Sequence, residues 1–115
     1  MLNTKHKILK VKIIQNKLVD WILNKISNKS LKIDGLTIGR LIFIRKNYLD
    51  ITLLAHELVH VLQYNQIGFF KFIYKYLKYN NKYGYRKNPF EIEAYKKQSS
   101  LFFRSWAKNI IDKVI

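Results

Sequence analysis

The sequence predicts a small α+β domain, and three observations support this fold class. Residues 5–28 and the second half of the chain repeat apolar side chains every three or four positions, which is the period of a helix. Residues 31–45 instead collect β-branched residues in short runs, which favours strands. The length of 115 residues fits one domain. Residues 1–115 are therefore expected to fold as a single unit.

The first expected element is a helix over residues 5–28. Its apolar positions at helical spacing are Ile8, Val11, Ile14, Leu18, Trp21 and Ile22. Residues 9–13 also alternate between apolar side chains and lysines, so the first third of this segment fits a strand as well. We expect Trp21 to anchor the core. His6 is expected to be exposed and not to bind a metal.

Two or three short antiparallel strands are expected within residues 31–45. Asp34-Gly35 is a turn signal, and the apolar run 36–38 follows it. Gly39 interrupts the pattern before residues 41–44, which read as a buried strand.

The next helix, starting at Asp50 or Thr52, carries the H-E-x-x-H motif. At four-residue spacing His56 and His60 project from one helical face, so two imidazole nitrogens can reach one zinc ion. Glu57 lies beside the metal, where it can take a proton from zinc-bound water. The alternative interpretation is a helix whose histidines only cap or pack.

Residues 69–79 form an amphipathic helix pattern with aromatic and basic faces. Phe69, Phe72, Ile73, Tyr76 and Leu77 fall on one side, and Lys71, Lys75 and Lys78 on the other. We favour a core-facing helix with a basic outer face. Contact with a membrane surface and stacking on nucleotides are the alternatives.

A further helix starts after Asn88, which can cap it, with Pro89 in its first turn. Catalytic zinc usually takes three protein ligands, and this chain has no cysteine and only three histidines. The third ligand is therefore expected to be a carboxylate. Glu91 and Glu93 begin this helix, either because carboxylates suit a helix N-terminus or because one of them binds zinc.

These two motifs resemble those of a known enzyme class. H-E-L-V-H at 56–60 followed by N-P-F-E-I-E-A at 88–94 resembles the gluzincins, whose third zinc ligand is a glutamate on a later helix. The E-x-E-A step resembles the CaaX prenyl protease and HtpX-type membrane metallopeptidases. The small size and residues 35–44 resemble their soluble miniature relatives, the minigluzincins. The resemblance covers about residues 33–96.

The resemblance implies a minimal zincin-like domain that hydrolyses peptide or protein substrates. It implies one Zn²⁺ per chain held by His56, His60 and Glu91, with Glu57 as the general base. Glu93 would orient a ligand or hold two helices together. Tyr95 stands where the membrane families have an aspartate. In zincins an extended substrate lies along the edge of the sheet beside the metal helix.

Two segments near these motifs carry further expectations. Tyr85 and Arg86, in the polar loop before the glutamate helix, are candidates for stabilising an oxyanion, with packing or solvent exposure as the alternative. Residues 99–115 are strongly apolar and must be buried in the core, in a partner or in the active-site cleft. Minigluzincins resemble zymogens, so we expect a latent enzyme whose segment 99–115 is inhibitory or forms a homodimer.

The net charge of +15 supports a rival function. Such a charge attracts nucleic acid, anionic membranes or acidic partners. The alternative is thus a basic protein that binds nucleic acid or a membrane surface and holds a structural metal. Nucleic acid is disfavoured because no helix-turn-helix, RNP or zinc-finger pattern occurs. An inactive zincin scaffold is disfavoured by the intact Glu57. Without a signal peptide pattern or a long apolar stretch, we expect a cytoplasmic protein.

Overall fold

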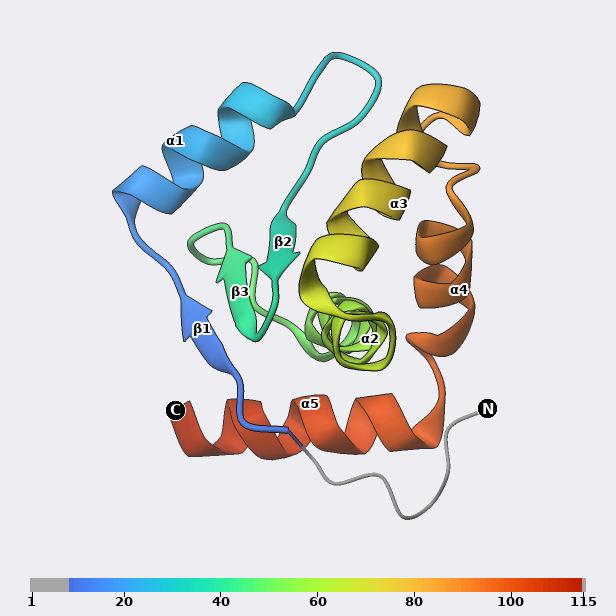
Figure 1. The fold of residues 1–115 in the computed structure, drawn as a ribbon. Coiled ribbons are helices and arrows are strands. Elements are labelled where there is room, and N and C mark those ends of the chain that lie inside the picture. Colours follow the sequence, from blue (N-terminus) through green and yellow to red (C-terminus); the bar gives the residue numbers. More distant parts are fainter. Residues whose placement is uncertain (1–8, 115) are drawn as a thin grey trace.

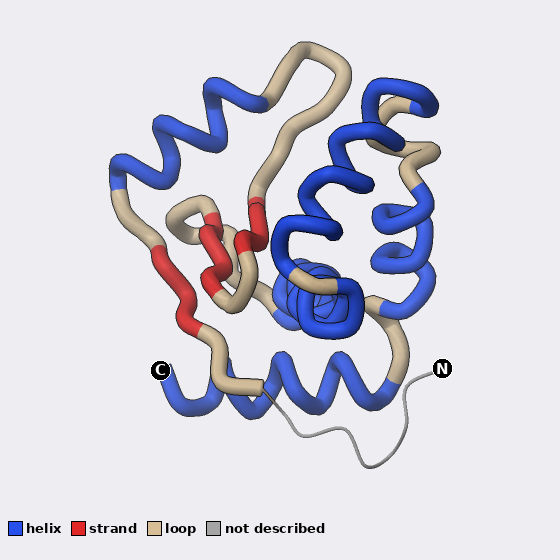
Figure 2. Tube along the Cα trace, viewed as in Figure 1, coloured by secondary structure: helices blue, strands red, loops and turns tan. Residues whose placement is uncertain are grey.

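The computed structural model describes residues 9–114, which form five helices and one three-stranded sheet (Figures 1 and 2). In chain order the elements are β1 (Lys12–Ile14), α1 (Lys17–Ile26), β2 (Gly35–Ile38), β3 (Leu41–Ile44), α2 (Ile51–Ile67), α3 (Phe69–Tyr83), α4 (Pro89–Lys97) and α5 (Leu101–Val114). The predicted α+β class is confirmed. The prediction for His6 lies outside the described residues.

Helix α2 is the centre of the molecule, and Figure 1 looks nearly along its axis. It packs against α3, α4, α5 and β2. Every residue from Leu54 to Tyr64 is buried, so this helix is apolar on most of its surface. Asp50 caps it by accepting a hydrogen bond from the Leu53 N–H at 2.7 Å. The motif histidines therefore lie in the interior.

The hairpin β2–β3 turns at Gly39, not at Asp34-Gly35 as predicted. Gly39 has a φ of 63°, a conformation that glycine adopts readily. Asp34 instead continues the ladder, since its carbonyl accepts the Arg45 N–H at 2.8 Å. Its carboxylate also accepts a hydrogen bond from Arg45 Nε at 2.9 Å. These two contacts hold the chain extended where the turn was expected.

The sheet is mixed, and the prediction of a purely antiparallel sheet is wrong. Its strand order is β1-β3-β2, with β1 parallel and β2 antiparallel to β3. The strand β1 lies in the segment predicted as the start of a helix, where residues 9–13 alternate. Asn16 then caps α1 by accepting the Val19 N–H at 2.8 Å. Because α1, the loop after it and β2 lie between β1 and β3 in the chain, β1 can pair in parallel with β3.

Helix α1 buries only a narrow strip of its apolar face. Val19 and Leu23 are buried, whereas Leu18 is 63% and Trp21 58% exposed. The prediction that Trp21 anchors the core is wrong. The strands have three or four residues each, so the sheet is too small to cover a wider stripe of α1.

Asn88 joins the end of α3 to the start of α4. It is fully buried, and its Nδ2 donates to the Tyr76 carbonyl at 3.1 Å and to Asn80 Oδ1 at 2.9 Å. Its Oδ1 accepts the Phe90 N–H at 3.0 Å. The capping role predicted for Asn88 is confirmed, and the cap also fixes where α4 begins. Helix α3 runs to Tyr83, four residues beyond the predicted segment.

The C-terminal helix α5 belongs to the core. Its side chains Phe103, Trp106 and Ala107 are buried in the same cluster as the apolar residues of α2. Of the three places considered for residues 99–115, the described part of this segment occupies its own core. An inhibitory or dimerising role for it stays a prediction. Within residues 9–114, every helix is too short or too polar to cross a membrane.

The two tryptophans provide a test of this packing. Trp106→Ala is expected to lower the free energy of unfolding by about 3–5 kcal/mol, because removing a buried ring leaves a cavity. Trp21→Ala, at an exposed position, is expected to change it by no more than about 0.5 kcal/mol. Urea unfolding followed by circular dichroism measures both values. Equal losses in the two variants would contradict the packing of α5 and α1.

Candidate metal centre

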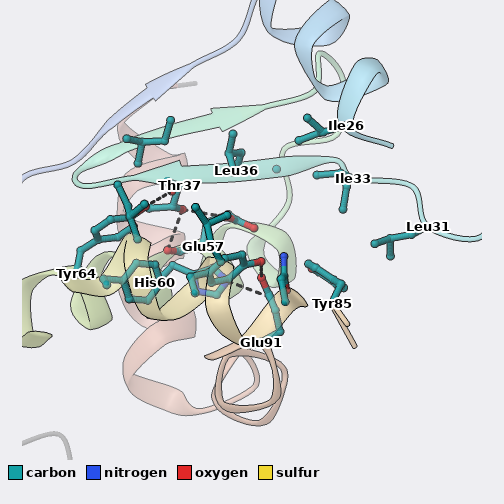
Figure 3. A pocket seen from close by; sticks show the side chains of 17 residues that line it. Ile26, Leu31, Ile33, Leu36, Thr37, Glu57, His60, Tyr64, Tyr85 and Glu91 are labelled. Atoms are coloured by element: carbon teal, nitrogen blue, oxygen red, sulfur yellow. Dashed lines mark hydrogen bonds and ion pairs between the residues drawn. The ribbon is translucent and has the colours of Figure 1, made fainter. Parts of the chain in front are cut away.

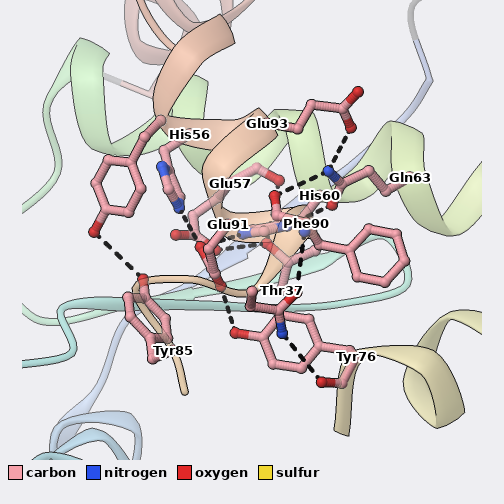
Figure 4. Close-up of polar contacts among 12 residues, drawn as sticks. Thr37, His56, Glu57, His60, Gln63, Tyr76, Tyr85, Phe90, Glu91 and Glu93 are labelled. Carbon is pink, nitrogen blue, oxygen red and sulfur yellow. Dashed lines mark hydrogen bonds and ion pairs between the residues drawn. The ribbon is translucent and has the colours of Figure 1, made fainter. Parts of the chain in front are cut away.

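Three side chains from two helices converge in the interior (Figure 4). His56 and His60 come from α2, and Glu91 comes from the first turn of α4. Glu91 Oε1 lies 2.9 Å from His56 Nε2 and 3.1 Å from His60 Nε2. One ligand atom from each residue lies within 4.8 Å of the others, and all three residues are buried. The structure thus brings together the three ligands expected from the sequence.

The Nδ1 atom of His60 is hydrogen-bonded to the side-chain amide of Gln63. The Gln63 amide nitrogen donates to the Phe90 carbonyl at 3.1 Å and to Glu93 at 2.6 Å. Its oxygen must therefore face His60 Nδ1, which lies 2.7 Å away. An amide oxygen accepts only, so Nδ1 carries a proton. In the neutral ring the Nε2 lone pair then points at the Glu91 carboxylate.

The Nε2 lone pair of His60 and the Glu91 carboxylate oxygen repel each other at 3.1 Å unless a cation lies between them. Without a metal, the cation is a proton. Burial by itself lowers the pKa of His60, but the hydrogen bond and charge of Glu91, together with the charge of Glu57, raise that pKa to about 9. Burial likewise raises the pKa of Glu91, yet hydrogen bonds from the two histidines hold it well below its ordinary value. Two imidazoles and a carboxylate are donors that suit Zn²⁺.

His56 is oriented from α4 by two residues. Its Nδ1 donates a hydrogen bond at 2.9 Å to Oε1 of Gln98, the residue that caps the C-terminal end of α4. The ring of Tyr95 packs edge-on against the His56 ring, with centroids 4.5 Å apart. Tyr95 stands where the resembled membrane families have an aspartate. Here the side-chain amide of Gln98, at the end of the same helix, makes the orienting hydrogen bond to His56.

Two residues of strand β2, Thr37 and Gly35, lie against Glu57 of α2, which was expected to be the general base. The Thr37 hydroxyl donates to Glu57 Oε1 at 2.8 Å (Figure 3). Gly35 lies so close that a Cβ atom there would be 3.1 Å from Glu57 Oε2. Glycine at position 35 therefore leaves the room that this carboxylate occupies. Glu57 is not one of the three clustered ligands.

Two cavities meet at the cluster. The larger, of about 460 Å³, has Glu57, His60 and Glu91 in its wall and is otherwise mostly apolar (Figure 3). The smaller, of about 260 Å³, reaches His56 and Glu57 from the other side. Tyr85 lines both cavities, and its hydroxyl lies 3.4 Å from that of Tyr95. The candidate ligands therefore line cavities that share Tyr85, with His60 and Glu91 in the larger and His56 in the smaller.

Of the two oxyanion candidates, only Tyr85 is at the cleft. Burial and the charge of Glu91 raise the pKa of Tyr85, so its hydroxyl keeps its proton and can donate. Arg86 instead donates to the Ser30 carbonyl at 3.1 Å and lines neither cavity. Its side chain ties two loops together.

Four polar residues of the site were missed by sequence reasoning. They are Thr37, Gln63, Tyr76 and Gln98. Gln63 follows His60 by three positions on one helix, a spacing that could have revealed it. Tyr76, whose hydroxyl donates to Glu91 Oε2, comes from α3 and has no local signal. Glu93 reaches His60 only through Gln63 and thereby joins α2 to α4.

No family model, curated protein or solved structure matches this chain. What the site can do chemically is therefore inferred from the positions of its own residues.

The two glutamines should determine how tightly the site binds metal. Gln63→Ala and Gln98→Ala are each expected to weaken zinc binding by about 10–100-fold, because each leaves a ligand histidine free to rotate and change tautomer. Gln66→Ala, an exposed position on the same helix α2, is the matched control and should bind zinc normally. Competition with a chelating dye measures the affinities. Unchanged affinity in both site variants would show that the glutamines do not orient the ligands.

Proposed function

We propose that this protein is a zinc-dependent peptidase of the gluzincin type, similar to the minigluzincins. One observation carries the proposal: His56, His60 and Glu91 converge beside a buried Glu57, at the wall of a cavity large enough for a peptide side chain. A structural zinc site is usually closed by four protein ligands. Three ligands facing a cavity instead favour a catalytic site.

The residues of the site divide the work of hydrolysis. When bound, zinc supplies Lewis acidity, which polarises a substrate carbonyl and acidifies a water molecule. Glu57 takes the proton of the attacking water and passes it to the leaving amine. The Thr37 hydroxyl donates a hydrogen bond to Oε1 of the Glu57 carboxylate. Oε2 of the same carboxylate makes no hydrogen bond within the described residues. That free oxygen can accept the proton.

Strand β2 and Tyr85 provide the means to position a substrate. β2 is an outer strand of the sheet, and all four of its residues, Gly35–Ile38, line the larger cavity. An extended peptide can add to such an edge through main-chain hydrogen bonds. The mostly apolar wall suits apolar side chains next to the scissile bond. The Tyr85 hydroxyl, protonated at the cleft, is the donor we assign to the developing oxyanion.

Latency through residues 99–115 is not needed for this proposal. Helix α5 packs in the core, and its described residues line neither of the two cavities at the cluster. An apolar cleft and three ligands are already accessible in the folded chain. A homodimer through α5 stays a prediction.

Metal content tests the ligand set. The purified protein is expected to bind about one zinc per chain, with binding lost or strongly weakened in His60→Ala and Glu91→Ala. Glu57→Ala and Glu93→Ala should still bind zinc, because neither side chain is a ligand. Atomic absorption after dialysis measures the ratio, and circular dichroism checks the fold. Loss of zinc in Glu93→Ala but not in Glu91→Ala would refute the assignment.

Hydrolysis of a fluorogenic peptide library tests the roles of Glu57 and Tyr85. Glu57→Gln is expected to lower kcat by about 10²–10⁴-fold while zinc stays bound, because the proton acceptor is gone. Tyr85→Phe should lower kcat by about 10²-fold and change KM little, because the hydroxyl acts on the transition state. Tyr83→Phe, in an exposed position of α3, is the control. If the wild-type protein with zinc cleaved no peptide, the peptidase proposal would be wrong.

A further inference from the structure

Two helices expose apolar faces that no described part of the chain covers. On α1 the exposed apolar side chains are Leu18, Trp21, Ile22 and Ile26. Leu18, Ile22 and Ile26 follow one another at four-residue spacing, so they form a stripe along the helix, with Trp21 beside it. Val19 and Leu23 are the buried residues of α1, and this stripe runs beside them along the helix.

Helix α3 has a similar stripe. Its side chains Phe70, Tyr74 and Leu77 are 83%, 65% and 61% exposed, at spacings of three and four residues. Phe72 is the only buried residue of this helix and packs against Tyr64 of α2. Of the predicted core-facing side, Phe72 is buried, Ile73 and Tyr76 are partly buried, and Leu77 is exposed.

Each stripe reaches the larger cavity at its last residue. Ile26 from α1 and Leu77 from α3 both line this cavity, and each is about half exposed. In Figure 1 strand β2 lies between the two helices. We call the exposed apolar residues of α1 and α3 together the two-helix rim. Two residues of the rim, Ile26 and Leu77, thus line the same cavity as Glu57 and His60.

The charges around the rim are positive. Exposed lysines accompany both stripes: Lys17 and Lys25 on α1, and Lys71, Lys78 and Lys82 on α3. Helix α3 has no acidic residue, and the single acid of α1, Asp20, accepts the Lys46 N–H at 2.8 Å. Against a net charge of +15, a second copy of this chain would be repelled from the rim. The complementary partner is anionic.

Among anionic partners, a lipid bilayer fits the rim better than a nucleic acid does. On α1 three of the four exposed apolar side chains, Leu18, Ile22 and Ile26, are aliphatic, and aliphatic groups offer no ring on which a base can stack. A bilayer surface takes up aliphatic and aromatic side chains and attracts lysines to its headgroups at the same time. We propose that the two-helix rim docks the protein on anionic membrane surfaces, with the mouth of the larger cavity towards the lipid. This docking does not depend on the metal or on peptidase activity.

The two tryptophans allow a direct test with the full-length chain. Trp21 is in the rim, whereas Trp106 is buried in the core. Mixed with phosphatidylcholine–phosphatidylglycerol vesicles, the protein is expected to sediment with the lipid, with tryptophan emission shifted to shorter wavelength. Lipids brominated in the acyl chains should quench that emission. Pure phosphatidylcholine vesicles should bind at least about tenfold less protein, since each lysine near an anionic surface contributes to binding. Equal binding to both vesicle types would overturn the charge argument.

Matched variants separate insertion of the rim from simple charge adsorption. Trp21→Phe should keep vesicle binding but lose the emission shift, which assigns the signal to the rim. Leu18→Ser combined with Phe70→Ser is expected to weaken binding by about tenfold, because two apolar side chains no longer enter the interface. Leu101→Ser removes an equally exposed leucine on α5 and should bind as the wild type does. All of these positions are exposed, so the fold should survive.

Three further outcomes would overturn the proposal. The first is the absence of binding to anionic vesicles. The second is binding that the rim variant leaves unchanged and that shows no emission shift, which would be adsorption by charge alone. The third is tighter binding to single-stranded RNA or duplex DNA than to vesicles, with a steep salt dependence and no effect of Leu18→Ser and Phe70→Ser. That result would assign the basic surface to nucleic acid.

Discussion

The interaction on which the structure depends is the contact of the Glu91 carboxylate with His56 and His60. A charge in a protein interior is stable only when it is paired and hydrogen-bonded. Glu91 meets this condition through two imidazoles and the Tyr76 hydroxyl. The described part of the chain leaves no buried side-chain nitrogen or oxygen without a partner. A divalent cation can replace the proton in this cluster, since the ligands already face one another.

The burial of α2 is what makes this cluster possible. Leu54, Leu58 and Val61 join the core cluster to which Phe103 and Trp106 of α5 also belong. The same turns of the helix carry the two histidines and Glu57 towards α4 and β2. One helix thus supplies the centre of the core and most of the site. A stable α5 is then a condition for a well-ordered cluster, although its described residues do not line the cavities at that cluster.

The outer surface complements the site. The small sheet covers only Val19 and Leu23 of α1, and α3 buries only Phe72. Of the exposed apolar side chains of both helices, Ile26 and Leu77 line the larger cavity, and exposed lysines accompany the rest. An apolar rim of this kind lowers solubility unless charge opposes self-association. The net charge of +15 provides that opposition and also favours anionic surfaces.

The sequence by itself determined the features that depend only on residues close together in one helix. The four-residue spacing of His56 and His60, the place of Glu57 beside them and the Asn88 cap are local properties, and the structure has them as expected. Packing between elements decided the rest. β1 formed because residues 12–14 found a partner in β3, a pairing that an alternating pattern allows but does not require. Trp21 is exposed because the sheet is small, and Thr37, Tyr76 and Gln98 reach the site from three other elements. Such contacts depend on how whole elements pack, and no spacing along the chain encodes them.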